Sequence, residues 1–292
     1  MAQLNSAYMA QVSKGLSKVF NDALKSENED YKKIATEINA NTLSVDYGWV
    51  GDIPNMVEWT GERTLKDLSA NLYTITRKKW ESTIQVSRDV IEYDSLGVVK
   101  PRVQAMAEAV REHYDEMTFG LLEANSACYD GKNFFANDHI VGSSTFKNLF
   151  DLPLNQENFL ALRTEMRGVS NEYGNPLRIR PSLLVVPPEL EVEAIKILKA
   201  QTLANGSSNI TYGMCDYLVS DRLTDERAWY LFDTTRVLKP LILQINKKVE
   251  FAGLDKPSDE NVFMRDTFLY GIRTEDNAGY GLWQLALKSK PN

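Results

Sequence analysis

Hydrophobic residues recur at helical spacing in two parts of this sequence. Over residues 9–23 and again over residues 99–124 they return every three or four positions, which predicts a helix with one apolar face in each part. Pro101 lies near the start of the second stretch, where a helix tolerates proline. We expect the first helix to dock on its own domain; a neighbouring subunit and a membrane surface are the second and third interpretations. The two stripes are Met9, Val12, Leu16, Val19, Phe20 and Ala23, and Val99, Val103, Met106, Val110, Tyr114, Met117 and Leu121.

Alternating residues between the two helices predict strands. The segment 47–86 is aromatic, charged and β-prone, and we expect an extended hairpin with strands at 72–77 and 80–86. Because a two-stranded ribbon alone is only marginally stable in water, it should rest on another part of the molecule. One face of the second strand carries Trp80, Ser82, Ile84 and Val86, and the other carries Glu81, Thr83 and Gln85.

The second half of the chain mixes short helices and strands. Residues 125–153 are rich in Asn, Gly, Ser and Asp, which predicts a loop region between two lobes. Asn155 can then cap a helix that ends at Gly168. The apolar residues that this helix would bury are Phe159, Leu162 and Met166.

A covered strand and another helix follow. The apolar run 182–186 predicts the strand, and Pro187 and Pro188 lead from it into the helix. Further strands are predicted at 229–232, 237–245, 268–273 and 280–287, with a turn over 274–279. This mixture places the chain in the α+β class, with no internal repeat.

Composition narrows the class of protein. The 292 residues suffice for about two domains. The net charge of -7 means that counterion release cannot drive general nucleic-acid binding. Two cysteines, Cys128 and Cys215, argue against a disulfide framework and for a reducing compartment. No segment approaches the roughly 18 apolar residues that cross a bilayer, and no signal-peptide pattern precedes the first helix, so we expect a cytosolic protein.

One segment brings a thiol, a carboxylate and an imidazole together. It permits a cytosolic hydrolase in which His139 activates Cys128 and Asp138 orients the histidine. A turn rich in Gly, Asn and Asp explains the same residues, and we favour it because no family-type signature surrounds the cysteine. His113 is expected to be an ordinary helix residue, since no second metal ligand lies at a recognised spacing. Nucleotide-binding, zinc-protease and serine-hydrolase motifs are absent from the sequence, so we predict no catalytic site, cofactor or metal.

Aromatic and basic residues gather around Arg77, Lys78, Lys79 and Trp80. Such a group can stack on single-stranded nucleic acid. The nearby acidic residues instead favour ion pairs with another protein surface, and a solvated face is the remaining interpretation.

Short recognisable segments follow one another in a fixed order along the chain. They are 48–54, 58–63, 73–75, 87–89, 128–131, Phe134, Phe135, Asp138, His139, 175–177, 184–188, 229–232, 239–241, 270–273, Gly279 and Tyr280. No single piece would suffice, but as an ordered set they resemble the major head subunit family of Mu-like phages, and the similarity covers the chain from about residue 4 to 287. Where that family often has proline after the histidine, this chain has Ile140, which bears on loop shape.

The resemblance implies the tailed-phage major capsid fold, also called the Johnson fold. It implies an N-terminal arm at 1–46, an extension-loop β-hairpin at 47–86, and a peripheral domain with a long spine helix at 87–154 and 252–292. The axial domain would take up residues 155–251. The residues that we expect to contact other subunits are Trp49, Trp59, Glu62, Arg63, Lys78, Lys79 and Trp80.

The implied function is that of a major capsid protein with no enzymatic activity. Its copies would assemble as pentamers and hexamers into an icosahedral shell around double-stranded DNA, without reading the DNA sequence. We expect it in the virion and, during assembly, in the bacterial host cytoplasm, without a membrane partner. Because only about 46 residues precede the expected loop, we expect a separate scaffold, with a portal and a maturation protease. A nanocompartment shell of the same fold and the Cys128/His139 hydrolase are the alternatives.

Overall fold

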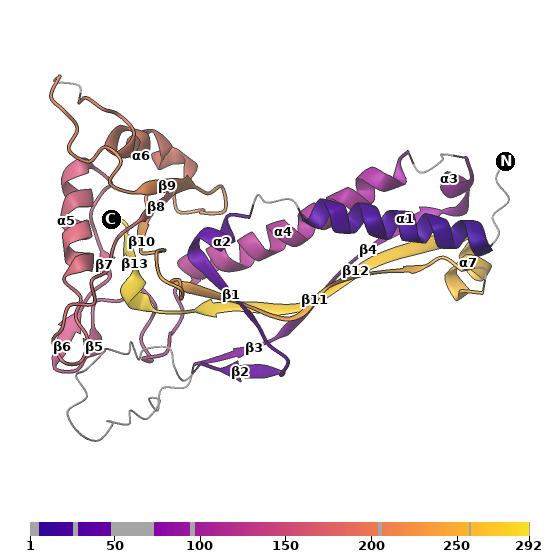
Figure 1. Ribbon diagram of the computed structural model, residues 1–292, viewed down its shortest axis with the longest axis horizontal. Helices are drawn as coiled ribbons and strands as arrows, with labels where there is room; N and C mark the ends of the chain where they lie inside the picture. The colour runs from indigo at the N-terminus through magenta and orange to yellow at the C-terminus, as the bar shows by residue number, and fades with distance from the viewer. Residues whose placement is uncertain are drawn as a thin grey trace, which may run out of the picture.

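The structure is a computed structural model and describes residues 6–25, 29–47, 73–93, 97–203, 206–256 and 258–291. Figure 1 shows an elongated molecule in which a long, narrow sheet runs through one part and a second sheet stands at one end of it. Helices pack on both sheets, which confirms the predicted α+β class.

The long sheet has four strands in the order β1-β11-β12-β4. At its centre β11 (Leu241–Leu254) and β12 (Thr267–Tyr280) run antiparallel along almost their whole length. The short β1 (Ala35–Asn39) pairs parallel with the start of β11, and β4 (Lys78–Ser87) pairs antiparallel with β12. β4 is therefore an edge strand, and β11 continues past residue 245, where the predicted strand ended.

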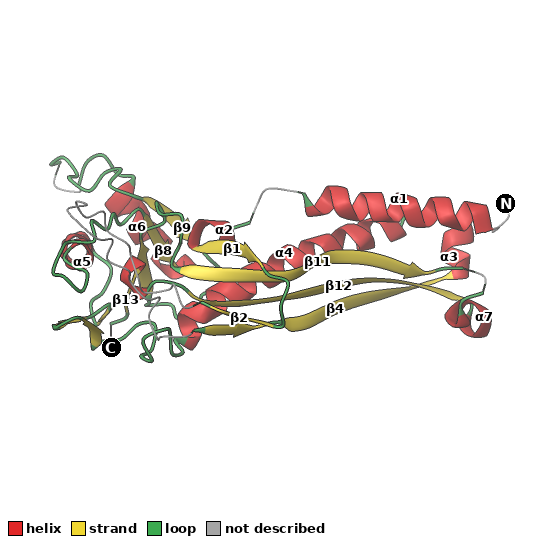
Figure 2. Cartoon of the chain, turned by 60° about the horizontal axis from the view of Figure 1, so that its bottom comes forward, coloured by secondary structure: helices red, strands yellow, loops and turns green. Residues whose placement is uncertain are grey.

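Two long helices run along the long sheet. Figure 2 shows α1 (Ser6–Leu24) and α4 (Val99–Ala124) beside its strands, and both predicted helices are confirmed. α1 packs on α4 and on β11, and the ring of Phe20 stacks on Phe251 of β11 with 5.3 Å between centroids. The apolar face of α1 is thus covered by its own chain. The buried members of its stripe are Met9, Val12, Leu16 and Phe20.

The predicted hairpin pairs differently from expectation. The strand predicted at 72–77 is β3 (Thr74–Thr76), and it pairs with β2 (Ser44–Asp46), not with β4. β4 alternates as predicted, since Val86 is buried while Gln85 and Ser87 are exposed. An apolar face of this kind is stable only when it is covered, and pairing with β12 places it beside α4.

The turn predicted at 274–279 is wrong, because β12 continues as a strand to Tyr280. Its polar residues resemble a turn in sequence, but Glu275 and Asp276 are buried and paired. Glu275 forms an ion pair with Arg77. Asp276 lies 3.1 Å from Nε2 of His113 and accepts a hydrogen bond of 2.7 Å from the Thr274 hydroxyl. Because these carboxylates have partners, the strand can continue through them.

The second sheet has the strand order β7-β13-β10-β8-β9. Its strands are β7 (Leu149–Phe150), β13 (Ala286–Ser289), β10 (Trp229–Phe232), β8 (Leu183–Val186) and β9 (Asp216–Val219). β8 and β10 are buried along their length, as predicted for covered strands. α5 (Gln156–Arg167) contacts β13, and α6 (Glu191–Leu198) contacts β8 and β9 after a 3-10 turn at Pro188–Leu190. The side chain of Asn155 accepts a hydrogen bond from the N–H of Asn158 at 2.8 Å, which confirms the predicted cap.

The two sheets are interleaved in sequence. β11 belongs to the long sheet and crosses residue 251, where a domain boundary was expected, and β13 completes the second sheet from the range 252–292. In the described part of the chain no helix is long and apolar enough to span a bilayer. Elements without a sequence prediction are the strands β1, β2, β7 and β9 given above, together with α2 (Tyr31–Ile34), α3 (Arg88–Tyr93), α7 (Glu260–Arg265), β5 (His139–Val141) and β6 (Ser144–Phe146).

The packing of α1 on α4 predicts the effect of shortening Leu16, which is fully buried. Leu16→Ala should lower the free energy of unfolding by about 2–5 kcal/mol, because it removes apolar contacts and leaves a cavity. Chemical denaturation of the unassembled subunit measures this change. Lys18→Ala, on the exposed side of the same helix, is the control and should stay within about 0.5 kcal/mol of the wild type. Equal stabilities of the two variants would contradict this packing.

Candidate functional site

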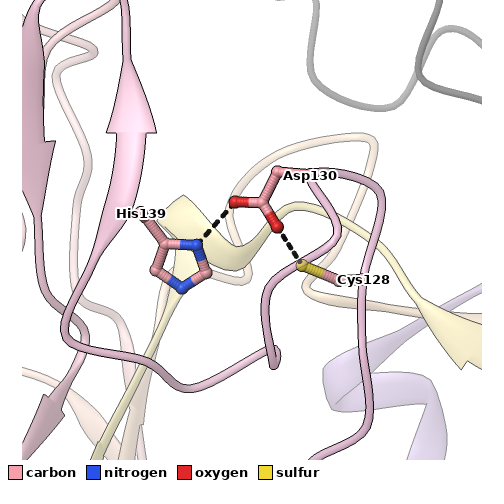
Figure 3. A group of neighbouring side chains, drawn as sticks. All are labelled: Cys128, Asp130 and His139. Carbon is pink, nitrogen blue, oxygen red and sulfur yellow. Dashed lines mark hydrogen bonds and ion pairs between the residues drawn. The ribbon is translucent and has the colours of Figure 1, made fainter.

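Cys128, Asp130 and His139 form one cluster in the loop region that follows α4 (Figure 3). One ligand atom of each lies within 4.8 Å of the others. A tight turn brings the first two together: the N–H of Gly131 donates to the carbonyl of Cys128 at 3.0 Å, and Gly131 has a φ of 76°, which favours glycine. His139 begins β5, and its ring points to the carboxylate.

Asp130, and not Asp138, is the partner of the histidine. Nδ1 of His139 lies 2.6 Å from Oδ2 of Asp130, and the Cys128 thiol donates to Oδ1 of the same carboxylate at 3.1 Å. Asp138 is exposed and pairs with Lys132, so the orienting role predicted for it is wrong. The chain folds back after the turn, and this brings the more distant aspartate to the imidazole.

His139 is fully buried and held from several sides. Its ring stacks on Trp283 with 4.0 Å between centroids and 7° between planes. Its Nε2 lies 3.2 Å from Oδ1 of Asn148. The amide nitrogen of Asn148 in turn donates to the carbonyl oxygens of Phe134 at 2.8 Å and of Ala286 at 3.2 Å. The histidine and the asparagine therefore tie the loop region to the segment between β12 and β13.

The electrostatics of the cluster disfavour nucleophilic chemistry. Burial raises the pKa of the Cys128 thiol well above its ordinary value, and the Asp130 carboxylate raises it further. The pKa of Asp130 would also rise through burial, but hydrogen bonds from His139, Cys128 and the N–H of Lys132 outweigh burial and hold it below its ordinary value. The thiol thus stays protonated and acts as a hydrogen-bond donor, whereas a nucleophilic cysteine is a thiolate.

The same three side chains are of types that bind zinc. Zinc takes four ligands in a closed structural site, and this cluster offers three. The carboxylate of Asp130 accepts hydrogen bonds from both of the other groups, so the cluster is complete as a set of hydrogen bonds. Its geometry suits a structural role, in which these hydrogen bonds hold the loop region in place.

Of the predicted contact residues, Lys78, Lys79 and Trp80 lie at the start of β4. Trp49, Trp59, Glu62 and Arg63 lie outside the described residues. The Trp80 ring lies against His113 of α4, with 4.5 Å between centroids, and 36% of the residue remains exposed. Lys78 and Lys79 are exposed. The structure therefore brings the tryptophan onto the helix and leaves the two lysines to solvent.

The strand that carries these lysines has one free side. β12 pairs with β4 on one side, and no strand of the described ranges pairs with the other. Backbone N–H and C=O groups on such an edge can pair with another chain, and lysines on it restrict which chains do so. The start of β4 is thus a cationic edge that an acidic protein surface can meet.

Sequence reasoning missed three residues of the buried cluster: Asp130, Asn148 and Trp283. Asp130 had a local signal, because an Asp-Gly pair predicts a turn that aims the carboxylate back at its own loop. Asn148 and Trp283 had none, since their roles depend on tertiary contacts.

Comparison with known proteins finds similarity along almost the whole chain. The family model described as "Mu-like prophage major head subunit gpT" matches residues 9–150, 150–223 and 220–292. The chain is 32% identical over 274 residues to the Mu-like prophage FluMu major head subunit of Haemophilus influenzae, a match that covers 93% of this chain and 70% of that protein. It is 30% identical over 275 residues to the major capsid protein of Escherichia phage Mu, with 94% and 70% covered. A chain of the procapsid of bacteriophage JBD30 has a TM-score of 0.66 and 33% identity, with 99% of this chain and 77% of that chain covered.

The buried cluster predicts a difference between two neighbouring aspartates. Asp130→Asn should lower the free energy of unfolding at neutral pH by about 2–4 kcal/mol, because the buried histidine and thiol lose their shared charged acceptor. Asp138→Asn, at the exposed surface, is the matched control and should cost no more than about 0.5 kcal/mol. Denaturant titrations of the unassembled subunit compare the two variants. Equal losses of unfolding free energy would contradict the structural role of the buried cluster.

The lowered pKa of Asp130 also fixes how this difference depends on pH. A carboxyl group whose pKa is lower in the folded state stabilises the fold above its unfolded pKa of about 4, and this contribution is lost as the pH falls through the folded value. The gap between wild type and Asp130→Asn should therefore be constant between about pH 5 and 7 and should shrink below about pH 4. The same titrations at these pH values measure it, and a gap that widens on acidification would refute the assignment.

Proposed function

The chain belongs to the family of Mu-like prophage major head subunits, gpT, and we propose that its copies enclose double-stranded phage DNA in an icosahedral shell. It is a major head subunit, a structural protein of the capsid, and it has the fold of phage capsid proteins. The observation that carries the proposal is the likeness, along almost the whole chain, to the chain of a phage procapsid. A net charge of -7 fits a container that lies near DNA without adhering to it.

Assembly by head-to-tail contacts suits the shape of the molecule. The long sheet extends far from the second sheet, so the two ends of one subunit can reach different neighbours (Figure 1). Heterologous contacts of this kind close into rings, and here the rings would be pentamers and hexamers. Many simultaneous contacts hold such a shell even when each one is weak.

The contact residues of this proposal are those at the start of β4 together with the segment that precedes it. The exposed Lys78 and Lys79 lie on an edge strand and would meet acidic groups of a neighbouring subunit. Trp80 would contribute through its exposed part. Trp49, Trp59, Glu62 and Arg63 belong to the same proposed extension loop, residues 47–86.

The proposed division of the chain follows the family resemblance. Residues 1–46 form the arm, 87–154 and 252–292 the peripheral domain around α4, and 155–251 the axial domain. α1 lies in the first half of this proposed arm, and its apolar face packs on α4 of the same chain.

The remaining parts of the proposal concern chemistry and partners. The subunit carries out no catalysis, and the protonated, buried thiol of Cys128 argues against the hydrolase alternative. A separate scaffold, a portal and a maturation protease act with it during assembly in the host cytoplasm, and the finished protein resides in the virion.

Assembly is tested directly by electron microscopy. The purified full chain, alone or produced together with its proposed scaffold, should form rings or closed shells in negative stain and sediment as a large species. Trp59→Ala and Arg63→Ala should lower the particle yield if the extension loop overlaps a neighbour. A wild-type subunit that stays monomeric under all these conditions would end the proposal.

Removal of charge on β4 tests the proposed cationic contact. Lys78→Gln with Lys79→Gln should reduce the particle yield several-fold while thermal unfolding of the subunit stays nearly unchanged, because both side chains are exposed and no acidic group is added opposite Asp276 and Glu275 of β12. Lys78→Arg with Lys79→Arg keeps the charge and is the control that should assemble normally. Normal yields from the Gln variant would remove these lysines from the contact.

A further inference from the structure

Three arginines line one hollow beside the second sheet. Arg163 and Arg167 come from α5, and Arg180 lies in the segment that enters β8. The hollow has a volume of about 430 Å³, and residues just before β8 and β9 also line it. We call it the arginine pocket.

The guanidinium groups of the arginine pocket lack acidic partners. Within the described ranges none of the three forms an ion pair, and Nη1 of Arg163 is buried without a hydrogen-bond partner. An unsatisfied buried donor of this kind costs about 1–3 kcal/mol, so a ligand that satisfies it is favoured.

The groups nearest to these arginines leave their charge uncompensated. Burial raises the pKa of Cys215, beside Arg163, to about 12, so its thiol is uncharged at neutral pH. Asp216 is on the rim with 88% of its side chain exposed, and its carboxylate is 4.0 Å from the amine of Lys199. The pocket therefore presents net positive charge to an incoming group.

The opposite edge of the same sheet carries unpaired acids. β8 and β9 run parallel, so the residues before both strands lie at one end of the strands and the residues after both lie at the other end. We call the end that follows the two strands the acidic edge. Glu189 and Glu191 follow β8, and Asp221 follows β9. All three are exposed, and their side chains form no ion pair within the part of the chain that the structure describes.

We propose that the arginine pocket of one subunit receives carboxylates of a second copy of this chain, presented by the acidic edge at Glu189 and Glu191. A basic group and an acidic group at opposite ends of the same strands cannot meet within a subunit, but copies that follow one another head to tail can bring them together. The inference rests on the proposed shell function and names a contact that closes its rings.

A carboxylate suits the pocket better than the phosphate of a nucleic acid. Both are bound by the planar fork of arginine. The acidic edge supplies carboxylates at the same stoichiometry as the pocket in every ring of identical subunits, whereas the chain as a whole carries a net charge of -7 and repels a polyanion. Binding of DNA phosphate is the competing outcome of the test.

A charge-swap experiment separates these outcomes. Arg167→Glu with Arg180→Glu reverses the two exposed arginines and spares the partly buried Arg163, so the fold is retained and thermal unfolding checks it. The concentration of full chain at which half of the subunits sediment as rings or shells should rise roughly tenfold or more. Glu189→Arg with Glu191→Arg should have a similar effect, and the combination of all four changes should restore assembly to within about threefold of the wild type.

The matched control is Arg178→Glu with Arg227→Glu, which makes the same change of charge at exposed positions outside the pocket and should assemble as the wild type does. The inference would be overturned if Arg167→Glu with Arg180→Glu assembled as well as the wild type, or if the variant with all four changes did not regain assembly. So would variants that build normal shells but retain less DNA, since the pocket would then bind phosphate. Absence of assembly by the wild type would instead overturn the proposed shell function.

Discussion

The antiparallel pairing of β11 with β12 is the interaction on which the rest of the subunit depends. The two strands hydrogen-bond over almost their whole length, and each offers its other side to one more strand, β1 or β4. Two strands alone would be only marginally stable in water, so the ribbon needs the apolar cover that α4 and α1 provide. The elongated shape follows from this pairing, because two 14-residue strands that pair along almost their whole length make a ribbon roughly 45 Å long.

Much of this fold follows from local pattern. The helix over Val99–Ala124 has a long apolar stripe, the cap at Asn155 has its own hydrogen bond, and β8 is a short run without polar residues. Each of these signals lies within one element and is independent of what packs against it. For that reason the sequence predicts them well.

The errors arise where a polar residue is neutralised by a distant one. Glu275 and Asp276 resemble turn residues, but Arg77 and His113 pair with them inside the sheet. The strand beside β4 was misassigned for a similar reason, because its true partner β12 lies far along the chain. In each case the deciding contact joins segments that the chain brings together only on folding, and spacing along the sequence carries no record of it.

The position of β13 has a consequence for the order in which the molecule can form. This strand inserts between β7 and β10, so the second sheet stays divided until residues 286–289 have emerged from the ribosome. β7 and β10 are separated by some eighty residues of chain and have no direct pairing of their own to hold them in place meanwhile. Pairings between such distant segments form slowly. A nascent subunit therefore completes its second lobe only after β13 has left the ribosome, and a chain that stops before this strand lacks the pairings that join β7 to β10.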